Sequence, residues 1–252
     1  MIQAEKHAAF AALHAPGAPV VLFNAWDAGS ARIVAEAGAK AIATGSYSVA
    51  GAQGFEDGED APLDIVVDNA ARIVAAVDLP VTVDFETGYG ASPEACGASL
   101  LRLLEVGVIG VNIEDRLLDA PDLRPVEAQA DRLRALAAAR SPDGVGAWIN
   151  ARTDVFLQST PDQHAGLVEA ALERGAAYAE AGGDSLFVPG LRDLDLIARV
   201  CEGASLPVNV MAGGKGPAIA DLAAAGVARV SFGGHPWRLA MAALKDAAAA
   251  LY

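Results

Sequence analysis

Residues 81–94 read Val-Thr-Val-Asp-Phe-Glu-Thr-Gly-Tyr-Gly-Ala-Ser-Pro-Glu, and this stretch contains the repeating pattern of the whole chain. Its apolar start is typical of a strand that is buried on both faces of a parallel sheet. Ser92-Pro93-Glu94 is a typical helix start, with a capping hydroxyl, a proline in the first helical position and an acid in the first turn. The stretch therefore predicts a strand, a polar loop and a helix, in that order.

The same pattern recurs along the 252 residues. Apolar runs predict eight strands, at residues 20–24, 41–44, 81–84, 110–114, 147–150, 185–188, 208–211 and 229–232. Helical patterns follow them, at residues 30–38, 63–77, 93–106, 126–139, 161–181, 194–202, 217–225 and 236–251. Four of these helices are expected to end at a glycine: Gly38, Gly107, Gly182 and Gly226. The mean repeat is about 30 residues, the size of one βα unit.

Eight βα units in a chain of this length predict an α/β fold of the (β/α)8 TIM-barrel type. No Gly-x-Gly-x-x-Gly opens the first helix, which argues against a dinucleotide-binding open sheet. No Ser/Pro-rich linker divides the sequence, so residues 1–252 are expected to form one barrel domain.

Composition excludes several classes of protein. The chain has 18 basic and 32 acidic side chains, a formal net charge of −14, and this argues against binding to a nucleic-acid backbone. Its two cysteines are far apart and predict neither a disulfide framework nor a zinc site. The N-terminus lacks a signal-peptide pattern, and no apolar run approaches ~18 residues. We therefore expect a cytoplasmic protein with no nucleic-acid or membrane partner.

Active sites of TIM barrels lie at the carboxyl ends of the strands, and acidic residues gather there in this sequence. Asp84 and Glu86 follow the third predicted strand, Glu114 ends the fourth, and Asp57 lies in an acidic loop after the second. Carboxylates that converge on one cavity repel one another unless a cation lies between them. Proteins usually bind Mg²⁺ through a few carboxylate ligands, and water molecules complete its coordination. Glu59, Asp60 and Asp115 are better interpreted as loop charges or helix caps.

Other residues at the same end of the barrel are candidates for substrate binding. Arg152 ends the fifth strand, where it would either bind a substrate carboxylate or pair with an acid such as Asp154. The turn Gly45-Ser46-Tyr47 can present backbone N–H groups to an anion. Asn209 in the seventh strand and His235 after the eighth are the remaining candidates at this end of the barrel. His235 precedes a proline, so a helix-capping role explains it as well as a catalytic one.

Four of these motifs together resemble the isocitrate lyase/phosphoenolpyruvate mutase superfamily. They are residues 24–32 (Asn-Ala-Trp-Asp-Ala-Gly-Ser-Ala-Arg), 84–90, 112–115 (Asn-Ile-Glu-Asp) and 149–154 (Ile-Asn-Ala-Arg-Thr-Asp), with the Asp57-Gly58 loop between the first two. The match runs in order from about residue 20 to 240, nearly the whole chain.

The resemblance implies a barrel whose last helix is exchanged with a neighbouring subunit, in a homodimer or homotetramer. It also implies Mg²⁺ or Mn²⁺, chelated by a 2-oxo acid or its enolate. By motif position Asp84 would bind the metal directly, and Asp57, Glu86 and Glu114 would hold its waters. The other implied roles are a carboxylate pocket made by Gly45, Ser46 and Tyr47, a substrate contact by Arg152, and an active-site asparagine of the lyase branch at Asn209.

Residues 116–125 depart from the pattern of the superfamily. Lyases of the superfamily carry a cysteine acid in this loop and phosphonomutases an Asn-Ser pair, and the loop has neither. Cys96 and Cys201 fall in predicted helices, far from the mouth of the barrel. Another group must then supply the proton, and water, Tyr47 and His235 are the candidates.

The leading hypothesis is a Mg²⁺-dependent carbon–carbon lyase for a small 2-hydroxy di- or tricarboxylate, acting through the enolate of a 2-oxo acid. Asp57, Arg152, Tyr47 and His235 are its candidate catalytic residues. The alternatives are an oxaloacetate decarboxylase or hydrolase, then a phosphonomutase, and a non-catalytic 2-oxo acid binder.

Overall fold

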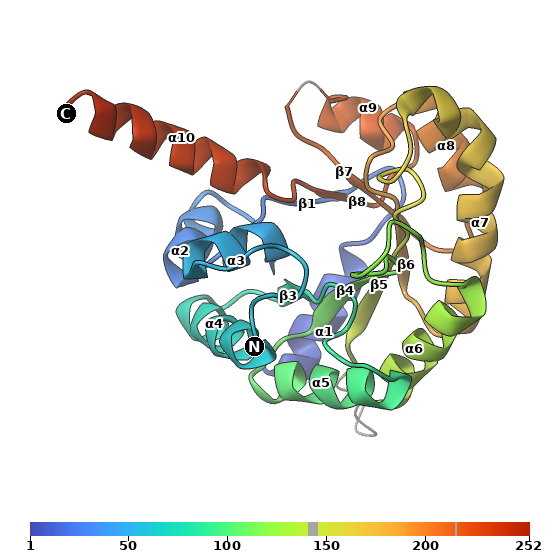
Figure 1. The fold of residues 1–252 in the computed structure, drawn as a ribbon, viewed down its shortest axis with the longest axis horizontal. Helices are drawn as coiled ribbons and strands as arrows, with labels where there is room; N and C mark the ends of the chain where they lie inside the picture. Colours follow the sequence, from blue (N-terminus) through green and yellow to red (C-terminus); the bar gives the residue numbers. More distant parts are fainter. Residues whose placement is uncertain (141–145, 215) are drawn as a thin grey trace.

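The chain folds into a nearly closed barrel of eight parallel strands (Figure 1). The computed structural model describes residues 1–140, 146–214 and 216–252. The strands are β1 (Val20–Leu22), β2 (Ile42–Ala43), β3 (Val81–Asp84), β4 (Gly110–Glu114), β5 (Trp148–Arg152), β6 (Ser185–Phe187), β7 (Val208–Met211) and β8 (Arg229–Ser231). Each pairs with its neighbours in the order β1-β8-β7-β6-β5-β4-β3-β2, and a parallel bridge between Ala25 and Thr44 joins the two ends. The predicted TIM barrel is confirmed.

Helices follow the strands around the outside of the barrel. They are α1 (Gln3–Ala12), α2 (Ala28–Glu36), α3 (Ser46–Gln53), α4 (Leu63–Ala76), α5 (Pro93–Glu105), α6 (Val126–Ala138), α7 (His164–Glu180), α8 (Leu194–Gly203), α9 (Ile219–Ala224) and α10 (His235–Ala249), with a 3-10 turn η1 (Pro161–Gln163) before α7. All eight predicted helices are present, whereas α1 and α3 were not predicted. None of the helices in the described part of the chain is long and apolar enough to cross a membrane.

Local sequence signals place the ends of these helices. The Ser92 hydroxyl accepts the N–H of Ala95 at 3.3 Å and caps α5, as its sequence predicts. The four glycines expected after helices all have a left-handed φ between 90° and 99°. That conformation is accessible to glycine and strained for most other residues, so it ends each helix before the next strand.

α1 closes the amino-terminal end of the barrel. Phe10 on α1 is fully buried among Val20, Ile109 and Trp148, residues at or before the starts of β1, β4 and β5. The His14 ring follows α1 and stacks on Trp148, with ring centroids 4.2 Å apart. The opposite end of the barrel remains open to form the site.

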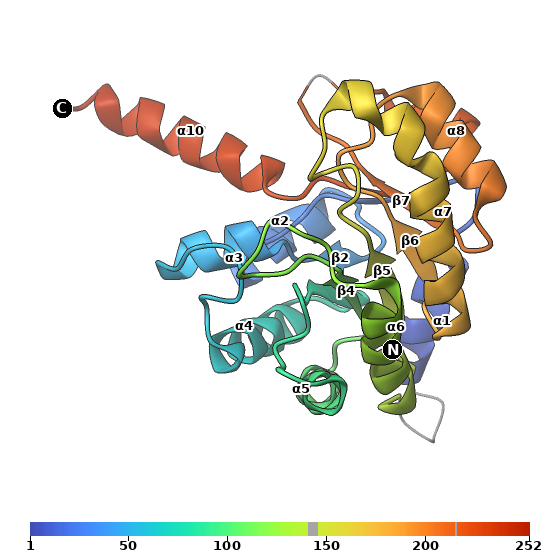
Figure 2. The ribbon, with the colours of Figure 1, turned by 45° about the vertical axis from the view of Figure 1, so that its right-hand side comes forward.

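α10 leaves the barrel instead of packing on it (Figures 1 and 2). Its one buried residue among those described is Pro236, and the side chains of Leu239 and Leu244 are exposed. On the outer face of the sheet, Val21 and Phe23 of the β1 segment are also exposed, beside Ile33 of α2. The barrel therefore has an uncovered apolar face, and α10 contacts the barrel through its first turn, where Trp237 packs against Trp26 with ring centroids 5.2 Å apart, while Leu239 and Leu244 further along stay exposed.

Buried His14 is expected to make the fold sensitive to acid. Burial lowers its pKa from 6.5 to about 3, with Arg229 acting in the same direction and a hydrogen bond to Phe10 O opposing. The unfolded chain then binds a proton that the folded chain excludes, so stability is lost as the pH falls below 6.5. The loss between pH 7 and pH 5 is about 2 kcal/mol. Urea unfolding at pH 7 and pH 5 measures the loss of unfolding free energy. The loss should be about 2 kcal/mol larger in the wild type than in His14→Gln, and an equal loss in the two proteins would contradict this role of His14.

Candidate active site

The carboxyl ends of the strands surround a pocket, here called the mouth pocket. Its described lining residues are Asn24, Gly45, Ser46, Tyr47, Asp57, Asp84, Asn112, Arg152, Leu157, Phe187, Pro189, Met211, Ser231, Gly233 and Gly234. Six of the predicted site residues lie in this lining: Gly45, Ser46, Tyr47, Asp57, Asp84 and Arg152. Most of the lining residues are polar, whereas Leu157, Phe187, Pro189 and Met211, from β6, the end of β7 and the loops after β5 and β6, form an apolar wall.

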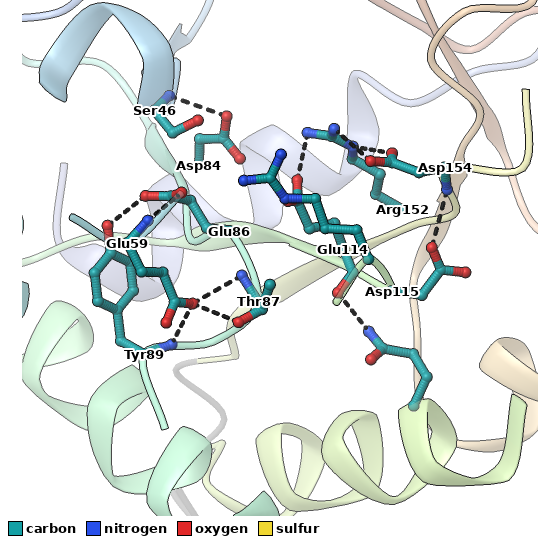
Figure 3. Close-up of polar contacts among 12 residues, drawn as sticks. Ser46, Glu59, Asp84, Glu86, Thr87, Tyr89, Glu114, Asp115, Arg152 and Asp154 are labelled. Carbon is teal, nitrogen blue, oxygen red and sulfur yellow. Dashed lines mark hydrogen bonds and ion pairs between the residues drawn. The ribbon is translucent and has the colours of Figure 1, made fainter. Parts of the chain in front are cut away.

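Asp84 at the end of β3 has one bound and one free carboxylate oxygen. Its Oδ2 accepts the N–H of Ser46 at 3.0 Å (Figure 3), whereas Oδ1 is buried without a hydrogen-bond partner in the described part of the chain. Burial raises the pKa of Asp84, and the nearby Arg152 guanidinium opposes the shift. Such a buried free oxygen needs a partner from outside the chain.

Ser46 is also the first residue of α3, so the predicted Gly-Ser turn is instead a helix start. Gly45 takes the N-cap position in extended geometry, and Gly45, Ser46 and Tyr47 line the mouth pocket, with the Ser46 N–H already donated to Asp84. A helix N-terminus favours an anion through its free N–H groups and its dipole. The Tyr47 ring lies at the rim against Gly234, where an added Cβ would come within 2.6 Å of Tyr47 Cδ1.

The loop after β3 is held by a carboxylate that the sequence interpretation treated as a loop charge or a helix cap. Glu59 Oε1 accepts hydrogen bonds from Thr87 N at 2.9 Å, Thr87 Oγ1 at 2.6 Å and Tyr89 N at 3.0 Å (Figure 3). Its own N–H donates to Glu86 Oε2 at 2.7 Å, and the Tyr89 hydroxyl donates to Glu86 Oε1 at 2.6 Å. Glu59, Glu86 and Tyr89 all have left-handed φ values of 47–60°. These hydrogen bonds hold a strained backbone in place.

We expect Glu59→Ala to lower the free energy of unfolding by about 2–3 kcal/mol, because three buried or half-buried donors lose a charged acceptor. Chemical denaturation measures this loss. Glu56→Ala, an exposed glutamate in the same loop, is the matched control and should stay within about 0.5 kcal/mol of the wild type. A Glu59→Ala protein as stable as the control would show that this clamp is not needed.

Glu86 is the second carboxylate of the predicted metal set. Burial raises its pKa to about 7, and the hydrogen bond from Tyr89 opposes the shift. Burial likewise raises the pKa of the Tyr89 hydroxyl, with the Glu86 charge adding to the effect, so Tyr89 remains a donor. Both Glu86 oxygens therefore accept from the chain itself.

Arg152 lies at the centre of a buried ion-pair network. Its Nε and Nη2 donate to the two oxygens of Asp154 at 2.6 and 2.9 Å, and Nη1 lies 2.6 Å from Glu114 Oε2 (Figure 3). Arg116 pairs with the other Glu114 oxygen at 2.8 Å. Burial lowers the pKa of Arg152, but Glu114 and Asp154 outweigh it and raise the pKa, so the guanidinium stays charged. Of the two sequence alternatives, pairing with acids is the contact present in this structure.

Glu114 and Asp115 differ in their surroundings. Burial raises the pKa of Glu114, and the Arg152 charge opposes it. Asp115 is fully buried away from the mouth pocket, where it accepts from Asp154 N at 2.9 Å, Tyr178 Oη at 2.8 Å and Arg174 Nη1 at 3.0 Å. Asp115 thus ties the end of β4 to α7, so it is neither the loop charge nor the helix cap that the sequence interpretation assigned.

The four predicted metal-site residues do not form a closed cage. Among residues 1–140, 146–214 and 216–252, no three His, Cys, Asp or Glu side chains are close enough to hold an ion by themselves. The free Asp84 oxygen and the exposed Asp57 carboxylate line the mouth pocket, whereas Glu86 and Glu114 already have partners. One direct carboxylate with the remaining sites left to water and substrate suits Mg²⁺, which keeps several waters.

Four predicted residues lie outside the described lining of the pocket: Glu86 and Glu114, whose partners are given above, and Asn209 and His235. Asn209 is fully buried beneath it, where its Nδ2 donates to Val210 O at 2.9 Å and to Ser231 Oγ at 3.2 Å. His235 is the first residue of α10 and lies against the loop after β7, where a Cβ on Gly213 would come within 3.2 Å of its ring. Their substrate-binding and catalytic roles stay predictions.

Residues 116–125 fold back on themselves beside the site. Leu117 N donates to Asp122 O at 3.1 Å, and Arg124 N donates to Asp115 O at 2.6 Å. None of these residues belongs to the described lining of the mouth pocket. The sequence interpretation did not single out two polar residues of that lining, Asn24 and Asn112, although both lie in the quoted motifs.

Comparisons with known proteins match nearly the whole chain. A family model described as phosphoenolpyruvate phosphomutase matches residues 10–252. Three relatives cover most of the chain. Phosphoenolpyruvate phosphomutase of Streptomyces hygroscopicus is 32% identical, over 93% of this chain and 76% of its own. 2-Methylisocitrate lyase of Salmonella typhimurium is 32% identical, over 79% and 68%, and oxaloacetate decarboxylase of Pseudomonas putida strain GB-1 is 31% identical, over 90% and 78%.

A solved structure from Burkholderia cenocepacia, provisionally named a phosphonomutase, superposes with a TM-score of 0.94. It is 47% identical, and the match covers 97% of each chain. The relatives therefore share the fold and include enzymes that break different bonds.

Proposed function

This chain belongs to the phosphoenolpyruvate phosphomutase family, and from that premise we propose that it is a Mg²⁺-dependent carbon–carbon lyase for a small 2-hydroxy di- or tricarboxylate. The substrate hydroxyl would lose its proton and its carbon would become the carbonyl of a 2-oxo acid, and the electron pair of the broken bond would pass to the other product as the enolate form of its carboxylate, which is then protonated. The observation that carries the proposal is the free, buried Asp84 Oδ1 in a pocket that also holds a helix N-terminus and a guanidinium.

The polar wall of the mouth pocket suits a substrate with a carboxylate next to a second oxygen. The N-terminus of α3, with Gly45, Ser46 and Tyr47, would bind the carboxylate. Arg152 uses three of its five N–H groups on acids, so two N–H groups are left for the substrate oxygen that gains charge. The acids on Arg152 fix its plane and keep it from turning away.

Asp84 would hold the magnesium ion, with Asp57, Glu86 and Glu114 positioned to hold its waters. A bound Mg²⁺ supplies polarisation of the substrate oxygens and offsets the charge that develops on them. The Glu59 clamp keeps Glu86 in place, and the Arg116 and Arg152 pairs do the same for Glu114.

The proton needed after cleavage would come from water or from Tyr47. Among the described residues that line the mouth pocket there is no cysteine, histidine or lysine. Tyr47 is 46% exposed at the rim, where its hydroxyl can exchange with solvent.

Product analysis tests the proposed reaction. The protein with Mg²⁺ is incubated with a panel of 2-hydroxy di- and tricarboxylates, and products are identified by proton NMR with and without EDTA. The expected result is an EDTA-sensitive pair of products, a 2-oxo acid and a shorter carboxylate. Turnover that EDTA leaves unchanged would contradict the metal-dependent mechanism.

Oxaloacetate decarboxylation is the second candidate, and the apolar wall of the pocket favours it. Leu157, Phe187, Pro189 and Met211 contribute apolar surface to its lining, with the Phe187 ring centroid 5.8 Å from Arg152 Cζ. A carboxylate placed against such a wall loses its hydration, which favours its departure as CO2. Pyruvate with CO2 would identify this reaction, and oxalate with acetate would identify hydrolysis.

We also propose that α10 packs on a second copy of the chain, in a homodimer or homotetramer. The exposed leucines of α10 and the uncovered face around Val21, Phe23 and Ile33 are complementary apolar surfaces on one molecule. Sedimentation should show at least a dimer for the wild type and a weakened assembly for Leu244→Glu. Lys245→Gln, which removes no apolar surface, is the control. A monomeric wild type at micromolar concentration would contradict this arrangement.

A further inference from the structure

A chain of hydrogen bonds crosses the barrel interior beneath the mouth pocket. The Trp148 indole Nε1 donates to Ser185 Oγ at 2.8 Å, and Ser185 Oγ donates to Asn150 Oδ1 at 2.6 Å. Asn150 Nδ2 then donates to Asn112 Oδ1 at 2.8 Å. From the other side, Arg229 Nη2 donates to the same Asn112 oxygen at 3.0 Å.

The Arg229 end of this chain fixes the direction of the bonds in it. A guanidinium can only donate, so Asn112 must present its oxygen to Arg229. Because Asn150 contacts that same oxygen, Asn150 must give its amide group to Asn112, and its carbonyl accepts from the Ser185 hydroxyl. The Ser185 oxygen in turn accepts from the Trp148 indole, which can only donate.

The amide group of Asn112 is left facing the mouth pocket. Asn112 pairs with Asp84 in the register of β3 and β4, and both side chains line the pocket. Asn112 is only 5% exposed, and its Nδ2 has no acceptor among the described residues. Two N–H donors are thus directed, with their orientation fixed from below, at the place where a ligand would bind.

The charge behind Asn112 has the sign that favours an anion. Arg229 is fully buried, and its Nε and Nη1 have no hydrogen-bond partner in the described part of the chain. Burial lowers its pKa to about 9, and Asp84 is the charge that opposes the shift, so Arg229 stays cationic at neutral pH. A buried charge with so few partners is costly, and a further anion nearby reduces that cost.

We propose that Asn112 is a substrate-binding residue whose Nδ2 donates to an anionic oxygen of the bound 2-oxo acid, with Arg229 as the positioning residue that orients it. This inference rests on the proposed function for the identity of the ligand, but the direction of the amide rests on the interior hydrogen bonds alone. Asn112 would thereby give the pocket an uncharged N–H donor. Such a donor favours a ligand with an oxygen acceptor at this position over a ligand with a donor group of the same size.

Asn112→Asp tests the proposal with oxalate as the probe, because oxalate presents two adjacent oxygens in a plane as the enolate of a 2-oxo acid does. One oxygen of the new carboxylate would still accept from Asn150 and Arg229, while the other would face the pocket as an anion. At saturating Mg²⁺, with Mg²⁺ affinity measured separately, oxalate binding by calorimetry should weaken about 100-fold. Thermal stability should not fall, since the new carboxylate pairs with Arg229.

Gln3→Glu is the matched control and should show the opposite pattern. Gln3 is a half-buried amide on α1, at the opposite end of the barrel, whose Nε2 donates to Leu104 O at 2.8 Å and to Val108 O at 2.9 Å. Its replacement should reduce thermal stability and leave oxalate affinity within about 3-fold of the wild type. If Asn112→Asp does not fold, Asn112→Ala, read well below its unfolding temperature, should bind oxalate about 10-fold more weakly.

Two results would overturn the inference in distinguishable ways. Equal oxalate affinity of the wild type and the Asn112 variants would remove the role of Asn112 and leave the proposed function intact. A wild type that binds no oxalate in the presence of Mg²⁺ would remove the proposed function and this inference with it.

Discussion

Asp84→Asn should lose at least about 1,000-fold of the Mg²⁺-dependent turnover and keep its fold. The change removes the one free, buried carboxylate oxygen in the mouth pocket and with it the direct ligand for the ion. A loss of about 4 kcal/mol of transition-state stabilisation corresponds to this factor, within the range that a metal ion supplies. Stability should not fall, because burial disfavours the Asp84 charge and the amide oxygen can still accept from Ser46 N.

Steady-state kinetics together with Mg²⁺ titration measures this effect. Asp64→Asn, which removes an exposed carboxylate paired with Arg102 on the barrel surface, serves as the control and should leave turnover unchanged. If Asp84→Asn retains wild-type turnover at any Mg²⁺ concentration, the metal does not act through Asp84.

Arg152→Gln should destabilise the protein by about 3–5 kcal/mol, because it leaves Asp154 as a buried carboxylate without its partner and Glu114 with Arg116 alone. Substrate binding should weaken as well, since the guanidinium is the one cationic side chain among the described lining residues. Arg134→Gln, an exposed arginine paired with Glu127 and Asp131, should change stability by less than about 1 kcal/mol.

Denaturant unfolding and oxalate binding separate the two roles of Arg152. Loss of stability with unchanged oxalate affinity would assign Arg152 to structure alone. Unchanged stability would contradict the ion-pair network itself.

The fold was largely predictable from the sequence because the strands are buried on both faces and the helix ends carry strong local signals. The runs at β3, β4 and β7 predicted their strands to the residue. α1 and α3 were missed for different reasons. α1 is amphipathic and plugs the barrel through Phe10, a tertiary contact, while α3 begins at a Gly-Ser pair that is also typical of a turn.

The site was predictable where residues end strands and less so where they act through others. Asp84 and Arg152 follow directly from their strand positions. The Glu59 clamp depends on three donors from the loop after β3, about 30 residues further along the chain, so no local pattern indicates it. Asn112 stands in a strand beside Asp84, but the direction of its amide is set by Arg229 on β8, 117 residues further along the chain.

Hydrogen exchange at carbon tests the central claim most directly, because the carboxylate product that leaves as an enolate exchanges its α hydrogens with solvent. The wild-type protein is incubated in D2O with Mg²⁺, succinate and either glyoxylate or pyruvate, and loss of the succinate proton signal is followed by NMR. We predict deuterium incorporation that is faster than in buffer, stops with EDTA and is absent in Asp84→Asn. Exchange at the buffer rate with both 2-oxo acids would contradict an enolate-stabilising site in this pocket.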